Sequence, residues 1–237
     1  MKKTIFILHG WAVASGNANQ EKWQPFIDQL ENAGHTVVFL KIPGLSAPLN
    51  TVWNLDDFVC WLSQEIQERA QNQKIVLLGH SFGGQIAVKY VAQNPKHIEK
   101  LILLDSAGIK DTAPKAVIKR AVFLVAAKVG RVIFTSDFMR SVLYKLAKES
   151  DYKNAPPLLR RTMSNILDAE VVADLPKISV PTKIIWGEND TVTPVKHAHQ
   201  MHVLITNSQL SLIADARHSP QFTHTTQTAE VVQEFLK

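Results

Sequence analysis

The stretch that most constrains the fold lies at residues 74–94, where an apolar run, a glycine-rich turn and an amphipathic segment follow one another. Residues 74–78 are typical of a buried strand, and residues 85–94 place apolar side chains at helical spacing. Between them, glycines lie two residues before and two residues after Ser81 and allow the backbone to reverse sharply. The pattern predicts a strained turn that exposes the Ser81 hydroxyl at the C-terminal edge of a sheet, beside the N-terminus of a helix.

Outside the segment 107–175, apolar strands alternate with helical patterns. Four strand-like runs come first, at 4–8, 36–40, 74–78 and 101–104. Helical patterns separate them, at 23–32, after a capping residue at Asn54, and at 85–94. The alternation resumes later, with strands at 183–186 and 209–213 and helices opened by Thr193-Pro194 and at 226–237. Because these strands are apolar on both faces, we predict an α/β fold, a mostly parallel sheet with helices on both faces.

Between residues 107 and 175 the alternation stops. Three or four helices are indicated with no strand between them, at 117–134, 138–147 and 158–172. Pro156-Pro157 breaks the run once, and Pro176 with Pro181 marks its end. We therefore expect the first part of the core at 1–106, a helical cap inserted at 107–175, and the second part of the core at 176–237.

The net charge of +5 is concentrated in this expected cap, which has 12 Lys and Arg against 7 Asp and Glu; the remaining residues have 14 of each sign. These basic residues alternate with apolar residues at helical spacing, which is typical of a solvated helix face. A nucleic-acid-binding surface would instead gather them on one face with aromatic residues between them. We therefore expect no nucleic-acid partner.

The single cysteine, Cys60, excludes an internal disulfide and fits a reducing compartment. Its apolar neighbours predict that Cys60 is buried as a small hydrophobic residue. The apolar run at 4–8 is too short for a secretory signal, and no uncharged run approaches the length of a membrane span. These observations favour a cytoplasmic protein without a membrane span.

A serine hydroxyl is a weak nucleophile until a neighbouring base takes its proton, so partners for Ser81 are expected in the loops that follow the later strands. Asp190 follows the strand at 183–186, and His218 follows the strand at 209–213. We predict that His218 is the base and that Asp190 orients its imidazole ring.

Glu188 and Asp215 are the alternative acids. Other histidines fit less well, because 197, 199 and 202 fall on an expected surface helix and 224 comes too late. The histidines follow no zinc-binding spacing, so we expect no metal. The sequence has no nucleotide-binding glycine fingerprint, and we expect no cofactor.

Nearly the whole chain resembles the α/β-hydrolase superfamily, through His9-Gly10, residues 79–84, residues 187–190 and the His218 loop. In that family a helical cap is inserted where residues 107–175 lie. The resemblance also implies that two backbone N–H groups, those of Trp11 and Phe82, stabilise an oxyanion. Because the loop at 12–17 is longer than is usual in the family, Ala12 is an alternative to Trp11.

The resemblance implies a serine hydrolase that needs no cofactor and cleaves small carboxylic esters through an acyl-enzyme, under the cap. Its partner would be a small-molecule ester. Members of the superfamily that form an ester intermediate on an aspartate are disfavoured, because the turn at residues 79–84 contains serine at the nucleophile position. A hydrolase of carbon–carbon bonds or lactones would use the same three residues and stays open as an alternative. A third possibility is a non-catalytic protein that keeps the fold and uses the cleft to bind a ligand.

Overall fold

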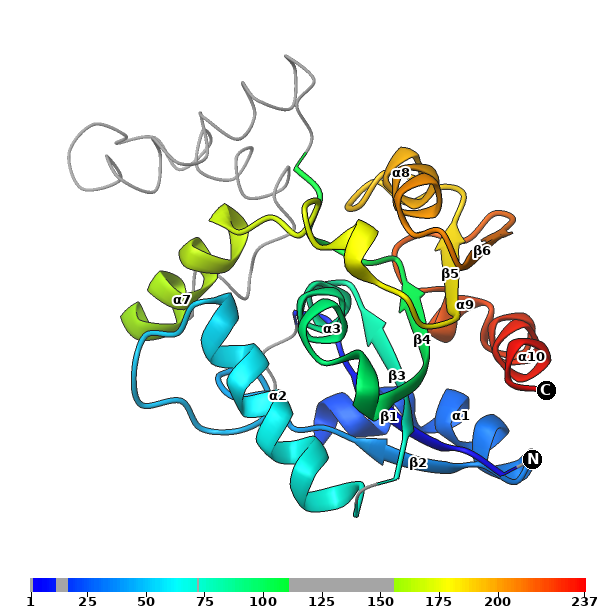
Figure 1. Cartoon of the computed structure of the whole chain (residues 1–237), viewed down its shortest axis with the longest axis horizontal. Helices are drawn as coiled ribbons and strands as arrows, with labels where there is room; N and C mark the ends of the chain where they lie inside the picture. Colours follow the sequence, from blue (N-terminus) through cyan, green and yellow to red (C-terminus); the bar gives the residue numbers. More distant parts are fainter. Residues whose placement is uncertain (1, 12–16, 72, 111–155) are drawn as a thin grey trace.

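The computed structural model describes residues 2–11, 17–71, 73–110 and 156–237, and at its centre is a six-stranded sheet (Figure 1). The strands lie in the order β2-β1-β3-β4-β5-β6, and every neighbouring pair is parallel. Their bounds are β1 Thr4–Leu8, β2 Thr36–Phe39, β3 Ile75–His80, β4 Ile98–Leu104, β5 Thr182–Gly187 and β6 Ser208–Ile213. The predicted parallel sheet is confirmed. All six strands therefore end at one edge, where ligands of parallel α/β sheets gather.

Helices cover both faces of the sheet (Figure 1). One face carries α1 Ala18–Asn32, α9 Pro220–Thr223 and α10 Thr225–Leu236. The other carries α2 Leu55–Arg69, α3 Phe82–Gln93 and α8 Lys196–Leu204. Two short 3₁₀ helices, Pro95–His97 and Leu175–Lys177, precede β4 and β5. Within the described residues, none of the helices has both the length and the apolar character that a membrane span requires.

The sheet separates two apolar cores, which explains why its strands are apolar throughout. Along β1, Ile5 and Ile7 pack into the core beneath α1 and α10, whereas Phe6 and Leu8 pack into the core beneath α2 and α3. Successive side chains of a strand point to opposite faces, so a strand covered on both sides needs an apolar residue at every position.

Several helix bounds differ from the predicted ones for local reasons. The helix expected at 23–32 begins five residues earlier, at Ala18, where good helix formers continue the helix without an apolar stripe. The helix expected at 85–94 begins at Phe82, directly after the turn. The helix capped by Asn54 is confirmed: the Asn54 side chain accepts hydrogen bonds from the N–H groups of Asp56 (2.7 Å) and Asp57 (3.2 Å).

The expected burial of Cys60 is wrong, because Cys60 is exposed. The buried positions of α2 are 55, 58, 59, 62 and 66, which form one face of the helix. Residue 60 lies about 100° around the helix axis from residue 59, beyond the edge of this buried face, so its side chain points toward solvent. Adjacent residues of a helix point in different directions, so apolar neighbours in the sequence do not ensure that a residue is buried.

Of the expected cap, the helices at 117–134 and 138–147 lie outside the described residues. The third is α7, Pro157–Asp168, which ends four residues before the expected position 172. The two sides of the undescribed segment meet near α3: Val171 N–H donates to the Gly108 carbonyl (3.0 Å), and the Gln85 amide donates to the Ala169 carbonyl (3.1 Å). Gln85 is four residues after Ser81, so Gly108 and residues 169–171, at the two ends of the expected cap, lie close to the predicted nucleophile.

Candidate active site

The turn that contains Ser81 has the strained geometry that the sequence predicts. Ser81 lies between β3 and α3 with φ 52° and ψ −117°, a backbone conformation that costs energy for a residue other than glycine. Main-chain hydrogen bonds hold it there: Ser81 N–H donates to the Leu104 carbonyl (3.0 Å), and its carbonyl accepts from Ala107 N–H (2.9 Å). A Cβ at Gly83 would lie 2.1 Å from the Leu8 carbonyl oxygen, so only glycine lets α3 begin this close to β1.

The structure brings Ser81, His218 and Asp190 into one hydrogen-bonded series. The His218 Nε2 atom lies 2.9 Å from Ser81 Oγ, and its Nδ1 atom lies 2.7 Å from Asp190 Oδ2. Because a carboxylate only accepts hydrogen bonds, His218 Nδ1 carries the hydrogen and donates it to Asp190. The neutral ring then leaves its Nε2 lone pair free to accept the Ser81 hydroxyl hydrogen. This tautomer is the one in which the imidazole can remove a proton from the serine.

Asp190 is buried at the end of β5 and is surrounded by donors. Its Oδ1 accepts the N–H groups of Val192 (2.7 Å) and Thr193 (3.1 Å), and its Oδ2 accepts the Thr193 hydroxyl (2.6 Å). Burial alone would raise the pKa of Asp190. The His218 hydrogen bond and charge, followed by the bonds from Thr193 and Val192, outweigh that effect and hold its pKa below the usual value. Asp190 is therefore an anion at neutral pH.

The competing residues lie elsewhere. Glu188 and Asp215 are exposed, and the His218 Nδ1 atom contacts Asp190 and Thr193 instead. His199 and His202 are exposed on α8 as expected. The surface position expected for His197 is wrong, because its side chain is only 5% exposed and shares the inner face of α8 with Ala198 and Met201.

His80 lies directly before Ser81 and supports the loop that contains His218. Its Nε2 atom is 2.8 Å from the His218 carbonyl oxygen, so this nitrogen carries the hydrogen and donates it. Burial, followed by the charge of His218, lowers the pKa of His80 to about 3. His80 is therefore a neutral donor that holds the main chain of His218 in place.

His9 supports the main chain at Gly10 and Trp11 in the way that His80 supports the main chain at His218. Its Nδ1 lies 2.7 Å from the Gly10 carbonyl oxygen and carries the hydrogen, so its Nε2, 2.8 Å from Ser46 Oγ, accepts the Ser46 hydroxyl. The ring stacks on Phe39 with centroids 5.3 Å apart. Burial lowers the pKa of His9 to about 4, so this ring too is neutral at physiological pH.

Both buried histidines make the stability of the protein depend on pH. Their folded-state pKa values lie below the ordinary 6.5, so the unfolded chain binds protons first as the pH falls. We expect the free energy of unfolding to decrease between about pH 6.5 and 4, with up to about 3 kcal/mol from His80. The melting temperature, measured by circular dichroism across this range, checks this expectation.

The matched variants are His80→Gln and, as a control, His199→Gln on the exposed face of α8. The loss of melting temperature between pH 6.5 and 4 should become smaller in His80→Gln and stay as in the wild type in His199→Gln. An equal pH dependence in all three proteins would contradict the assignment of a buried neutral His80.

The two residues expected to supply the oxyanion N–H groups lie close to each other. The rings of Trp11 and Phe82 pack with centroids 5.7 Å apart. Phe82 is the first residue of α3, a position whose N–H has no partner within the helix and lies at its positive end. Trp11 follows Gly10, whose carbonyl is bound by His9. The alternative, Ala12, lies outside the described residues.

Three residues of this site were not identified from the sequence: Thr193, His80 and Asp105. Asp105 is fully buried directly after β4 and accepts the Gly187 N–H at 2.9 Å. The rule that functional residues follow parallel strands could have found it, because β4 lies beside the strand of the serine turn. For His80 no sequence signal existed, since its partner His218 is 138 residues away. Thr193 lies only three residues after Asp190, to which its hydroxyl donates, so the loop that contains the predicted acid could have pointed to it.

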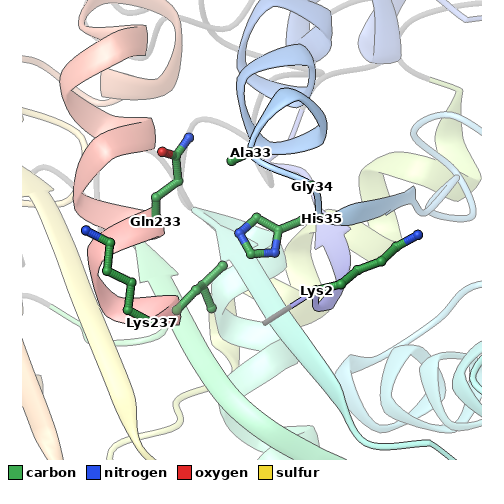
Figure 2. Close-up of a pocket in the computed structure, with 7 residues that line it drawn as sticks. Lys2, Ala33, Gly34, His35, Gln233 and Lys237 are labelled. Carbon is green, nitrogen blue, oxygen red and sulfur yellow. The ribbon is translucent and has the colours of Figure 1, made fainter.

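A hollow of about 410 Å³ lies far from this site, at the opposite edge of the sheet (Figure 2). It is lined by Lys2, Ala33, Gly34, His35, Gln233, Leu236 and Lys237. Lys2 and His35 come just before β1 and β2, whereas Ser81 follows the end of β3. In Figure 2 the ammonium groups of Lys2 and Lys237 point away from each other.

Comparison with known proteins supports a family assignment. A model of the family described as serine aminopeptidase, S33, matches residues 1–223. Monoacylglycerol lipase ABHD6 of Homo sapiens is 26% identical over 263 residues, covering 99% of this chain and 75% of that protein. The 2-hydroxy-6-oxononadienedioate/2-hydroxy-6-oxononatrienedioate hydrolase 1 of Pseudomonas putida is 27% identical over 256 residues, covering 99% and 88%.

Other relatives are longer than this chain. An uncharacterized protein of Mycobacterium tuberculosis is 25% identical over 191 residues, which are 69% of this chain but only 56% of that protein. Among solved structures, a serine hydrolase involved in carbazole degradation has the same fold, with a TM-score of 0.72 and 24% identity, over all of this chain and 91% of that one. With the family model over most of its length, the chain belongs to the α/β-hydrolase superfamily, among hydrolases of the serine aminopeptidase S33 type.

Proposed function

We propose that the protein is a serine hydrolase that cleaves small carboxylic esters through an acyl-enzyme. Ser81 is the nucleophile, His218 the general base and Asp190 the acid that orients it. The observation that carries the proposal is the hydrogen-bonded series from Ser81 Oγ to His218 (2.9 Å) and from His218 to Asp190 (2.7 Å). It has the geometry in which a serine hydroxyl is activated for attack on a carbonyl carbon.

The proposed reaction has two halves. His218 Nε2 takes the Ser81 proton while Ser81 Oγ attacks the ester carbonyl, and the same nitrogen then protonates the departing alcohol. In the second half, His218 removes a proton from water, which attacks the acyl-enzyme; the bond between the acyl group and Ser81 Oγ then breaks, the acid is released, and His218 returns the proton to Ser81 Oγ. The Asp190 carboxylate stabilises the imidazolium that forms in each half and keeps the hydrogen of the neutral ring on Nδ1.

The negative charge that develops on the carbonyl oxygen also needs donors. We assign this role to the main-chain N–H groups of Phe82, at the N-terminus of α3, and Trp11. Donors already fixed by the fold stabilise such a charge without rearrangement. The hydrogen bonds of His9 to the Gly10 carbonyl and of Ser46 to His9 support this assignment, because they fix the chain just before Trp11.

An aromatic wall beside the nucleophile favours an ester with an acyl chain: the rings at its two ends, Trp11 and Trp53, are partly exposed, and the two rings between them are buried. From Trp11 the rings continue through Phe82, Phe58 and Trp53, with successive centroids 5.7, 5.1 and 4.9 Å apart. Trp53 is joined to α7, since its N–H donates to the Thr162 hydroxyl (3.1 Å) and its carbonyl accepts the Asn165 amide (3.1 Å). We propose that residues 107–175 form a cap over this wall. The human relative named a monoacylglycerol lipase supports an acyl ester as substrate.

A second candidate function is hydrolysis of a carbon–carbon bond. The relative from Pseudomonas putida, a hydrolase of 2-hydroxy-6-oxo dienedioates, is equally similar and is covered over more of its own length. The same three residues could catalyse this reaction, so assays with both classes of substrate are needed to distinguish the two functions. A non-catalytic binding protein is disfavoured, because it would not need the strained Ser81 or the ordered tautomer of His218.

We expect the protein to hydrolyse p-nitrophenyl butyrate with a kcat/KM about 10-fold above that for the acetate. The two additional methylene groups contribute about 0.8 kcal/mol each when they are buried against the aromatic wall, and 1.4 kcal/mol corresponds to a tenfold change. Release of p-nitrophenol from esters of increasing chain length measures this preference, and a fluorophosphonate probe should label Ser81 in the same preparation.

The panel should also include an amino acid p-nitroanilide and a 2-hydroxy-6-oxo dienoate. Cleavage of either compound with a kcat/KM far above that of every ester would contradict the ester proposal and identify an amidase or a carbon–carbon hydrolase. Failure of the probe to label Ser81 while a substrate is turned over would contradict the nucleophile assignment itself.

A further inference from the structure

Asp105 is a carboxyl group buried at the same sheet edge as the candidate active site, where the mechanism above does not use it. It follows β4 directly, between the ends of β3 and β5, and its side chain is 0% exposed. Its φ of 43° lies in the left-handed region that residues other than glycine seldom adopt. A strained, buried and ionisable residue at this edge has a structural cost, which points to a function.

Asp105 contacts the β5 segment that carries Asp190 at three points. Its N–H donates to the Ile185 carbonyl (3.0 Å), and its Oδ1 accepts the Gly187 N–H (2.9 Å). Its main-chain oxygen lies 3.2 Å from the hydroxyl of Thr193. Asp190 lies between the second and third of these points, so Asp105 contacts both sides of the loop that presents the acid to His218.

The surroundings of Asp105 suit a neutral carboxylic acid. Oδ1 has one N–H donor, whereas Oδ2 is buried with no hydrogen-bond partner among the described residues. A buried carboxylate with a single donor is expensive, and a second carboxylate beside it adds repulsion. Burial raises the pKa of Asp105 to about 8, against the Gly187 N–H, which lowers it; the nearby charge of Asp190 adds to the rise.

The negative charge of the pair therefore resides on Asp190, which has three N–H or O–H donors besides His218. The proton resides on Asp105. We propose that Asp105 is a positioning residue for Asp190: a neutral carboxylic acid that fixes the acid loop through Oδ1 and directs its proton toward the Asp190 carboxylate. This inference rests on the proposed function, because it assigns to Asp105 the orientation of the acid of that mechanism.

The proposal is tested with Asp105→Asn and Asp105→Gly, since both residues tolerate a positive φ. Asparagine keeps a neutral group with an acceptor for Gly187 and a donor for Asp190, whereas glycine removes both. We expect Asp105→Gly to lower kcat by about 10- to 100-fold with little change in KM, because misplacing a catalytic group by about 1 Å has an effect of this size. Asp105→Asn should restore most of that loss, to at least about 10 times the rate of the glycine variant.

Two further measurements do not depend on the identity of the substrate. The rate at which a fluorophosphonate labels Ser81 reports activation of the serine and should follow the same order. The infrared C=O stretch of a protonated carboxyl group, recorded at about pH 6, should be present in the wild type and absent from Asp105→Asn. Asp215→Asn and Asp215→Gly are the matched controls, because Asp215 is an exposed aspartate that also has a positive φ of 58°; both should resemble the wild type in all measurements.

Each of three results would overturn the proposal. An Asp105→Asn variant as slow as Asp105→Gly would show that the charge of Asp105 is needed. An unchanged labelling rate in Asp105→Gly would show that Asp105 only stabilises the fold. An infrared band of equal intensity in the wild type and in Asp105→Asn would show that no part of the band comes from Asp105 and that Asp105 is therefore ionised; this holds even if the glycine variant does not fold. If the wild type cleaves none of the esters but keeps the band and the order of labelling rates, the proposed substrate fails and the role of Asp105 stands.

Discussion

Ser81→Ala should abolish ester hydrolysis while the protein keeps its fold. Without the hydroxyl there is no acyl-enzyme, and loss of the nucleophile of a hydrogen-bonded triad lowers kcat by about 10⁶-fold. Alanine is as small as serine, and the main-chain hydrogen bonds that hold residue 81 do not involve the side chain. Release of p-nitrophenol measures the loss, and the melting temperature checks the fold. The N–H donors and the binding site could still leave about 10³-fold catalysis over water.

The matched control is Ser106→Ala. Ser106 is a buried serine two residues after β4, whose hydroxyl donates to the Ala107 carbonyl (3.0 Å) and does not contact His218. This variant should keep its activity within a few-fold of the wild type. If Ser81→Ala hydrolyses the ester at the rate of Ser106→Ala, Ser81 is not the nucleophile.

The second large effect is expected for Asp190→Asn, which should lower kcat by about 10⁴-fold. An asparagine amide can donate a hydrogen to His218 Nδ1, and the ring then carries its own hydrogen on Nε2. In that tautomer the atom 2.9 Å from Ser81 Oγ can no longer accept the serine proton. Measurement of kcat and KM separates this loss from weaker substrate binding, because KM should change little.

Asp215→Asn is the control, since Asp215 lies three residues before His218 and is one of the two alternative acids. Its carboxyl group is exposed, and its removal should leave kcat unchanged. A severe loss in Asp215→Asn together with a silent Asp190→Asn would show that the acid is misassigned and that the loop geometry differs in solution.

The parts of this protein that depend on local signals could be predicted from the amino-acid sequence alone. Apolar runs alternating with helical patterns predicted the parallel sheet, because strands covered on both faces must be apolar throughout. The glycines around Ser81 predicted the strained turn, since only they allow so sharp a reversal. Parallel strands end at one edge, so Asp190 and His218 could be expected beside Ser81 although they are more than 100 residues away from it.

Which side chains are buried, and which partners they contact, depends on how distant parts of the chain pack together. Cys60 is exposed and His197 is buried, against expectation, because the packing of each helix decides which of its faces is covered. The supporting contacts join distant positions: His80 bonds to His218, 138 residues away, and Asp105 to Gly187, 82 residues away. A local pattern shows that a residue can donate or accept a hydrogen bond, but the fold decides which atom lies within 3 Å of it and whether burial keeps it neutral.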